Sequence, residues 1–453
     1  MTHFLPVRIV DSQPVGGGPP MTPKAIVASA FALVALATAC ATVRAQSPAA
    51  PKPEPSTTAE STLSGVMPLE ERVLLASKIY AQVTTFFPEL SRAQFEGAYA
   101  AYVARILRAS GRREFDWASM ELLASLHDGH TWFDDPWLER ASGQPVGFIA
   151  YPIDAKWTVV RSLLDVLRPG DIITAIDETP FDDFFARQRR YVSASSDREA
   201  ALDFFETPLV FPNRFRLTLA DGRHVAVDRK NGKQSPAPAP TTEGRWLTRG
   251  AIAYVKVPTF QGIEMQTRAI EWLRQFHDAK AIIVDVRGNR GGGYPIALTE
   301  ALMTEPYRAW TQSSAVRGGE LVRTENPTYS RDATLIAGEA IVRPRATVYG
   351  GRLILLIDRA CASGCEDFVM PFKTAKRATL VGETTAGTFS DTARTAFDNG
   401  MLLNIAAVRK SFPDGTRFEG TGIAPDVAVA TTAEDLAASH DNVLHRAVDL
   451  ANP

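Results

Sequence analysis

The sequence predicts an α/β protein in which strands and helices alternate along the C-terminal half. After Arg245, runs of apolar and β-branched residues have the length of buried strands: AIAYVKV, AIIVDV, LILLID and ATLVG. The segments MQTRAIEWLRQF and PIALTEALM, which lie between strands, repeat apolar residues at helical spacing. Buried strands joined by helices favour a largely parallel sheet.

The N-terminus has the layout of a secretory signal peptide over residues 1–45, with Met21 as a possible start. Lys24 precedes a long apolar run, and small residues lead to a cleavage point near Ala45. We therefore expect an exported chain, periplasmic or extracellular, with no membrane span in its mature form. Cys40, in LATAC, resembles a lipoprotein cleavage site, so a lipid anchor there stays an alternative.

Composition says little about partners. The 453 residues include 49 basic and 51 acidic side chains, for a formal net charge of −2. This balance does not favour nucleic acid or an anionic membrane as partner.

Before the α/β part, the chain divides at changes in composition. Residues 46–65 are rich in Pro, Ala, Ser and Thr and are expected to form a disordered linker. Residues 66–140 carry apolar side chains at helical spacing, and residues 141–230 carry short strand-like runs such as FIAYPI and FRLTLA. A second linker, at 231–245, contains SPAPAP.

The remaining residues form the predicted core, 246–432, and a helical tail, 433–453. Four motifs occur in order in the core: IIVDVRGNRGGG, LLIDRACASGCEDF, RATLVGETTAG and FEGTGIAPDV. This order resembles the tail-specific, or C-terminal-processing, serine protease family. LRPGDIITAID, in the preceding region, resembles a PDZ-domain segment.

The resemblance implies a crotonase-like catalytic core that follows an N-terminal helical region and a PDZ-like domain. It implies a serine endopeptidase that cleaves polypeptides and uses no metal or other cofactor. One branch of the family resembles a Ser-Lys dyad, with the lysine 25 residues after the serine. Counting from Ser363 leads to Thr388, so that lysine is missing.

The other branch, tricorn-like or retinoid-binding-protein-like, instead uses an upstream histidine and a glutamate near the end of the core. This chain has His130 in LHDGHT and Glu419 in FEGTGIAPDV. A serine hydroxyl needs a base with a pKa near neutrality, and imidazole qualifies. We expect Ser363 as nucleophile, His130 as its base, and Glu419 on the other ring nitrogen.

Backbone groups near Ser363 are candidates for stabilising an oxyanion. Gly364 follows the nucleophile at a helix start, and Gly291 and Gly292 follow the strand AIIVDV. The resemblance implies that their N–H groups form the oxyanion hole.

A peptide-binding site is expected in the PDZ-like region. Gly147, Phe148 and Ile149 could form a carboxylate-binding loop that leads into a strand and captures a peptide C-terminus. The same residues could also be plain scaffold.

Each candidate has a structural alternative. Ser363 and Glu366 fit a capping box, His130 could be a packed residue at a helix end, and Glu419 could be an ordinary loop carboxylate. The glycine run could be only a tight turn. A non-catalytic protein that binds lipid or peptide through the same fold is the main alternative function.

Other chemistries are open to residues in these segments. Cys365 could be a nucleophile, and His127 with His130 could bind zinc, although no clear third ligand accompanies them. Cys361 and Cys365 could form a disulfide, but two buried thiols are the favoured interpretation.

Overall fold

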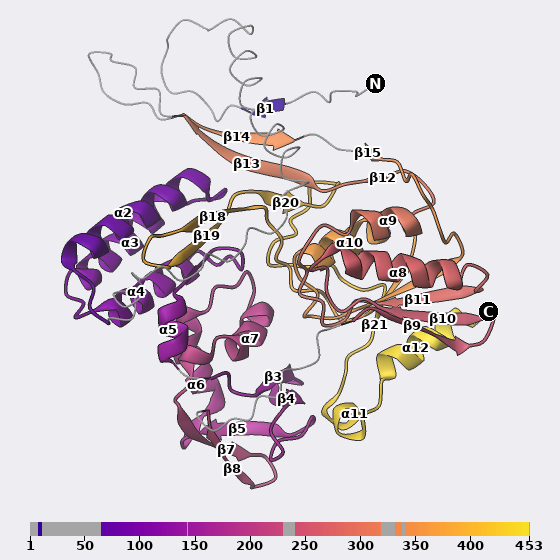
Figure 1. Cartoon of the computed structure of the whole chain (residues 1–453), viewed down its shortest axis with the longest axis horizontal. Helices are drawn as coiled ribbons and strands as arrows, with labels where there is room; N and C mark the ends of the chain where they lie inside the picture. Colours follow the sequence, from indigo (N-terminus) through magenta and orange to yellow (C-terminus); the bar gives the residue numbers. More distant parts are fainter. Residues whose placement is uncertain are drawn as a thin grey trace, which may run out of the picture. The chain divides into compact units, whose positions relative to one another are not determined.

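The computed structural model describes residues 8–10, 65–142, 144–229, 241–318, 331–337 and 341–452 (Figure 1). The predicted signal peptide lies outside these residues except for strand β1 (Arg8–Val10), and so does Cys40. Of the two predicted linkers, only 65 and 241–245 are described. Within the described ranges, no helix has the length and apolar character needed to cross a membrane.

The region predicted to be helical contains α2 (Leu69–Phe86), α3 (Arg92–Ile106), α4 (Arg112–Ala124), β2 (Trp132–Asp134) and α5 (Pro136–Ala141). Apolar faces of the long helices pack into one cluster. Strand β2 was not predicted. It pairs with a strand of the core, where Phe133 lies opposite Leu403.

The next region is a twisted antiparallel sheet with short helices. Its elements are β3 (Phe148–Ile153), β4 (Lys156–Ser162), β5 (Ile172–Ile176), β6 (Thr179–Pro180), α6 (Phe181–Gln188), η3 (Arg189–Tyr191), α7 (Asp197–Glu206), η4 (Pro208–Val210), β7 (Arg214–Leu219) and β8 (His224–Asp228). The strand order is β3-β4-β5-β7-β8, with β6 added to β5. Aromatic side chains fill the space between sheet and helices.

The α/β part is built on a sheet in the order β21-β17-β16-β11-β10-β9. Its strands are β9 (Glu243–Thr248), β10 (Ile252–Lys256), β11 (Ala281–Asp285), β16 (Arg352–Ile357), β17 (Thr379–Gly382) and β21 (Val427–Ala428). All neighbours are parallel except β9 and β10, as the near-continuous apolar runs predicted. Strand β9 begins at Glu243, inside the segment predicted to be a linker.

Helices cover both faces of this sheet (Figure 1). On one face lie α8 (Ile263–Gln275), α9 (Ile296–Leu302) and α10 (Gly364–Thr374). On the other lies α12 (Asn442–Ala451), which follows α11 (Ala433–Ala438). Side chains of β11 point alternately to the two faces of the sheet: Val284 packs in the core on one face and Ile283 in the core on the other.

Further strands extend the core. They are β12 (Tyr307–Arg308), β13 (Thr311–Gly318), β14 (Arg331–Ala337), β15 (Ile341–Val342), β18 (Thr392–Ala396), β19 (Leu402–Ala406) and β20 (Arg409–Ser411). Strands β18, β19 and β2 form one sheet, which joins the helical region to the core. This pairing brings the loop before β2 to the carboxyl end of β16, where α10 begins.

Candidate active site

Ser363 lies in the tight turn between β16 and α10. Its backbone has φ 54° and ψ −120°, a region that a residue with a Cβ enters at a cost of about 1–3 kcal/mol. The turn closes where the Cys365 N–H donates to the Ala362 carbonyl at 3.0 Å. Strain of this kind at a strand-to-helix turn is typical of an exposed nucleophile.

The capping interpretation of Ser363 accounts for only part of its contacts. Residues 363–366 have the capping-box arrangement, and the Ser363 N–H donates to Glu366 Oε2 at 3.3 Å. The hydroxyl oxygen, however, lies 3.1 Å from Nε2 of His130. The side chain therefore reaches the expected base while Glu366 holds the backbone.

His130 is fixed by its own backbone in the loop between α4 and β2. Its N–H donates to Asp128 Oδ1 at 2.9 Å, and its carbonyl accepts a hydrogen bond from the Asn404 amide at 2.6 Å. Burial lowers the pKa of the imidazole below its ordinary value of 6.5. At neutral pH the ring is thus uncharged, the form that can accept a proton.

Thr388, rather than Glu419, contacts the other nitrogen of the imidazole. Its hydroxyl oxygen lies 3.0 Å from Nδ1 of His130. The expected direct contact of Glu419 is therefore wrong, and the reason is the course of the loop after β17. Thr388 donates its N–H to Glu366 Oε2 at 3.0 Å and accepts the Ser363 N–H at 2.8 Å, which keeps it beside the ring.

Glu419 lies one step further from His130. Its side chain is buried, and Oε1 accepts a short hydrogen bond from the hydroxyl of Ser195. Burial raises the pKa of Glu419 to about 8, and the charge of Asp128 adds to the rise; Arg409 and the Ser195 hydrogen bond oppose it. The solvated-loop interpretation of Glu419 does not fit this buried, hydrogen-bonded carboxyl group.

Ser195 links the carboxyl group to Thr388, and no sequence pattern singled it out. Its hydroxyl oxygen lies 3.4 Å from Thr388 Oγ1 and accepts the Gly129 N–H at 2.9 Å. It comes from the loop before α7, in the region with the antiparallel sheet, while Glu419 comes from the C-terminal part of the core. A continuous path of side chains therefore leads from Ser363 through His130 and two hydroxyl groups to a carboxyl group.

Arg409 holds this path in place and was also missed. It is buried, and one guanidinium nitrogen lies 3.2 Å from Asp128 Oδ2 and 3.3 Å from Glu419 Oε2. Asp128 in turn fixes the backbone of His130. One cation thus joins the base's loop to the distant carboxyl group.

The glycine loop after β11 lies directly against the nucleophile. A Cβ on Gly291 would lie 2.6 Å from the Gly364 nitrogen, and one on Gly364 would lie 2.5 Å from the Gly293 carbonyl oxygen. Gly291 is not a free donor, because its N–H donates to Asn289 Oδ1 at 2.8 Å. Among the hydrogen bonds of the described residues, the N–H groups of Gly292 and Gly364 have no acceptor. Of the three predicted donors, the Gly291 N–H is thus already engaged, and those of Gly292 and Gly364 stay candidates.

The predicted peptide-binding residues lie apart from this path, in β3 and the turn before it. Gly147 has φ 82°, and its carbonyl accepts the Leu163 N–H at 2.8 Å. Phe148 is buried against Phe205, with ring centroids 5.3 Å apart, and Ile149 is half-buried. Phe148 is therefore a core residue and cannot offer its ring to a peptide.

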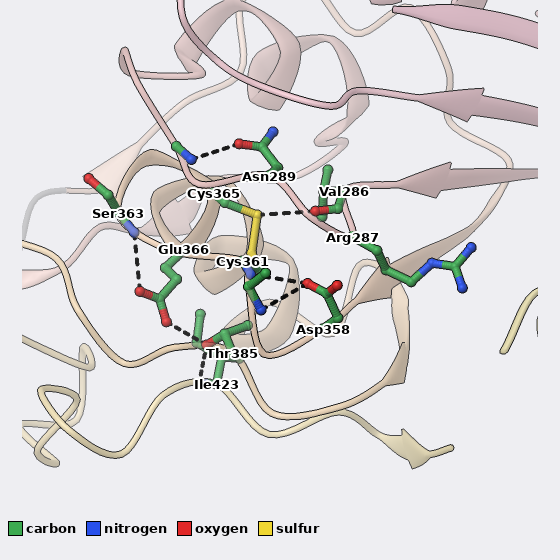
Figure 2. Close-up of a disulfide and its surroundings, with 12 residues drawn as sticks. Val286, Arg287, Asn289, Asp358, Cys361, Ser363, Cys365, Glu366, Thr385 and Ile423 are labelled. Atoms are coloured by element: carbon green, nitrogen blue, oxygen red, sulfur yellow. Dashed lines mark hydrogen bonds between the residues drawn. A yellow bond between two sulfur atoms is a disulfide. The ribbon is translucent and has the colours of Figure 1, made fainter. Parts of the chain in front are cut away.

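The competing cysteine and zinc chemistries find no support. Cys361 and Cys365 form a disulfide, so the expectation of two buried thiols is wrong, and Cys365 has no thiolate to attack with (Figure 2). His127 is exposed, whereas the ring of His130 faces two hydroxyl groups. No group of three or more metal-ligating side chains is present in the described ranges.

Comparison with known proteins relates part of the chain to a family. A family model described as Peptidase family S41 matches residues 251–429. The chain is 28% identical over 210 residues to a protein of Streptomyces coelicolor named as a tricorn protease homolog, covering 46% of this chain and 16% of that protein. It is 24% identical over 260 residues to carboxyl-terminal-processing peptidase 2, chloroplastic, of Arabidopsis thaliana, covering 57% of this chain and 45% of that protein. The chain thus spans less than half the length of each of these relatives.

Solved structures share the fold. Mature CPAF complexed with lactacystin superimposes with a TM-score of 0.62 at 13% identity, over 86% of this chain and 98% of that chain. A second structure of mature CPAF gives a TM-score of 0.60 at 14% identity, over 85% of this chain and 97% of that chain. At such low sequence identity, these superpositions show a shared fold and nothing more. The shared fold is an α/β arrangement that extends over most of the described residues.

Proposed function

The chain contains a domain of peptidase family S41 in residues 251–429, and from this we propose that it is a serine endopeptidase with Ser363 as nucleophile. The observation that carries the proposal is the 3.1 Å distance between Ser363 Oγ and His130 Nε2. This is within the reach that a general base needs to take the hydroxyl proton. It also favours catalysis over a role in which the same fold only binds lipid or peptide.

The proposed reaction requires one tautomer of His130. For Nε2 to accept the Ser363 proton, the ring must carry its own proton on Nδ1, where Thr388 Oγ1 accepts it. The Thr388 hydroxyl then donates toward Ser195. The Ser195 hydroxyl accepts the Gly129 N–H and donates its own hydrogen to Glu419 Oε1.

This order of donors links the imidazole to the carboxyl group through two hydroxyls. When Nε2 takes the proton, the ring becomes an imidazolium, and the polarised path to Glu419 stabilises that charge. Thr388 and Ser195 are thus positioning residues, and Glu419 acts through them. A hydroxyl is a weaker partner than a carboxylate, so each step contributes less than a direct contact would.

The peptide bond is cleaved in two stages in this proposal. Ser363 Oγ attacks the substrate carbonyl carbon as His130 removes its proton, and the carbonyl oxygen becomes an oxyanion near the N–H groups of Gly292 and Gly364. Collapse of the intermediate breaks the C–N bond, with His130 giving its proton to the leaving amine. Water then hydrolyses the ester on Ser363 by the same base.

The domain assignments also remain proposals. We assign residues 66–140 to a helical region, 141–230 to a PDZ-like domain, 246–432 to a crotonase-like core and 433–453 to a helical tail. Ser195 supports a working connection between the second region and the core, because it brings a hydroxyl from one to a carboxyl group of the other. We propose polypeptide substrates in an exported setting; the disulfide supports an oxidising compartment.

Cleavage of an unfolded polypeptide tests this function. Purified protein is incubated with reduced, carboxymethylated casein, and the products are identified by mass spectrometry, with Ser363→Ala as the matched control. Internal cleavage by the wild type and none by the control is expected. Equal cleavage by both proteins would contradict the assignment of Ser363.

A further inference from the structure

A disulfide joins the residues two positions before and two positions after the proposed nucleophile. Cys361 and Cys365 are bonded to each other, and Ser363 is the residue midway between them (Figure 2). Both cysteines are fully buried. The sulfur bridge therefore ties together the two ends of the short segment that carries the reacting hydroxyl.

The bridge lies just outside the strained turn. The turn runs from Ala362 to Cys365 and closes by the 3.0 Å hydrogen bond between them. With φ 54° and ψ −120°, Ser363 has the dihedrals of the first central residue of a type II′ turn, a position that favours glycine. A serine stays in such a conformation only where its surroundings hold it there.

Other contacts also hold parts of this segment. Cys361 is fixed on the strand side, where its N–H donates to Asp358 and its carbonyl accepts the Ala386 N–H at 2.9 Å. Cys365 is in the first turn of α10, with its sulfur 3.7 Å from the Val286 carbonyl oxygen (Figure 2). In the segment 361–365, the disulfide adds a side-chain cross-link to the backbone between the strand side and the helix side.

We propose that the Cys361–Cys365 disulfide positions Ser363 for attack on the substrate, and that reduction of it by a dithiol lowers the acylation rate reversibly. The inference rests on the proposed function. Without the bridge, the turn can relax toward negative φ at Ser363. That movement shifts Oγ relative to His130 and the N–H of Gly364, and a misplacement of about 1 Å can cost on the order of a hundredfold in rate.

The redox step is a thiol–disulfide exchange. A thiolate of the dithiol attacks one sulfur of the bridge, forms a mixed disulfide and releases the other cysteine sulfur. The second thiol of the reductant then closes its own disulfide and releases the protein. Two electrons and two protons pass from the dithiol to the cysteines, which end as thiols.

The test compares the oxidised and reduced forms of the whole chain. Wild type is treated with dithiothreitol until thiol titration of a denatured sample finds Cys361 and Cys365 free, and the rate of fluorophosphonate labelling at Ser363 is measured on the folded protein. We expect the labelling rate to fall on the order of tenfold or more and to recover on reoxidation. With a peptide substrate, kcat should fall in the same way while KM stays unchanged. Melting temperature and far-UV circular dichroism are recorded for each form.

A double variant, C361A/C365A, provides the control. It should label as slowly as the reduced wild type and should not respond to dithiothreitol. Reduced wild type that labels at the oxidised rate, with both thiols free, would overturn the positioning role. Loss of labelling that accompanies global unfolding in both samples would also overturn it, because the bridge would then stabilise the whole fold.

These results separate this inference from the proposed function. Oxidised wild type that never labels removes the peptidase proposal itself. Oxidised wild type that labels, with no effect of reduction, removes only the role of the disulfide.

Discussion

The hydroxyl oxygen of Thr388 lies 3.0 Å from Nδ1 of His130, on the side of the ring that faces away from Ser363. Imidazole can act as a base through Nε2 only while its proton stays on Nδ1. In the proposed mechanism, Thr388 is the acceptor that fixes this tautomer. Substitutions of Thr388 therefore test whether its hydroxyl orients the His130 ring.

Thr388→Val removes the acceptor and keeps the shape of the side chain. A hydrogen bond of this kind is worth about 1 kcal/mol net, so we expect kcat/KM to fall by about fivefold to tenfold. Thr388→Ser keeps the hydroxyl and should stay close to wild type. The measurement is steady-state kinetics on one peptide; a valine variant as active as the serine variant would show that Thr388 does not orient the ring.

Ser195 and Glu419 should act as one unit. Ser195→Ala removes the donor that lowers the pKa of Glu419 and interrupts the path to Thr388, so kcat falls. In a Glu419→Gln background the same change should cost much less, because the path is already broken. A double-mutant cycle on kcat measures the coupling, and additive effects would contradict the path.

Ser196→Ala is the matched control for Ser195. Its hydroxyl caps α7, accepting the Glu199 N–H at 3.1 Å, and contacts neither Thr388 nor Glu419. We expect a loss of about 1 kcal/mol in the free energy of unfolding and little change in kcat.

Arg409→Met should destabilise the fold strongly. It leaves Asp128 and Glu419 buried without their shared cation, and such a loss typically costs about 3–5 kcal/mol. Urea unfolding measures the change. Glu89→Gln removes an exposed partner of the same guanidinium and should cost less than about 1 kcal/mol; equal effects would mean that the buried contacts are not the ones that matter.

The pH dependence should report His130. The pKa of His130 lies below 6.5, so its ring stays neutral, and able to accept a proton, to a lower pH than an ordinary histidine. We therefore expect the acid limb of kcat/KM below pH 6.5. As the pH falls, this histidine is protonated in the unfolded chain before it is protonated in the folded one. The free energy of unfolding therefore decreases as the pH falls through 6.5. An acid limb above pH 7 would contradict a buried histidine as the base.

The sequence predicted the elements around Ser363 because their signals are local. Apolar runs marked β16 and β17, the ordered motifs singled out Ser363, and the segment LHDGHT singled out His130 as its candidate base. Thr388 was noticed only as a missing lysine, since its role depends on a loop held by Glu366. Ser195 and Arg409 contact the site across large sequence separations, which periodicity does not record.

Two predictions, the Gly291 N–H as an oxyanion donor and Cys361 and Cys365 as free thiols, were wrong because residue spacing does not determine which hydrogen bond or covalent bond a group forms. The Gly291 N–H donates to the side chain of Asn289, two residues earlier, so of the Gly291–Gly292 pair the N–H of Gly292 is the remaining candidate donor. A separation of four residues permits Cys361 and Cys365 to be either thiols or a disulfide, and the turn at Ser363 decides between them by bringing their Cα atoms to 5.4 Å.

The most direct test of the account is covalent labelling of the oxidised chain with a fluorophosphonate, read by intact mass and peptide mapping. The account predicts one phosphonyl group on Ser363 of the wild type, much slower labelling of folded His130→Ala, and none of Ser363→Ala. A folded wild type that stays unlabelled, or a label that persists in Ser363→Ala, would contradict the claim that Ser363 is an activated nucleophile.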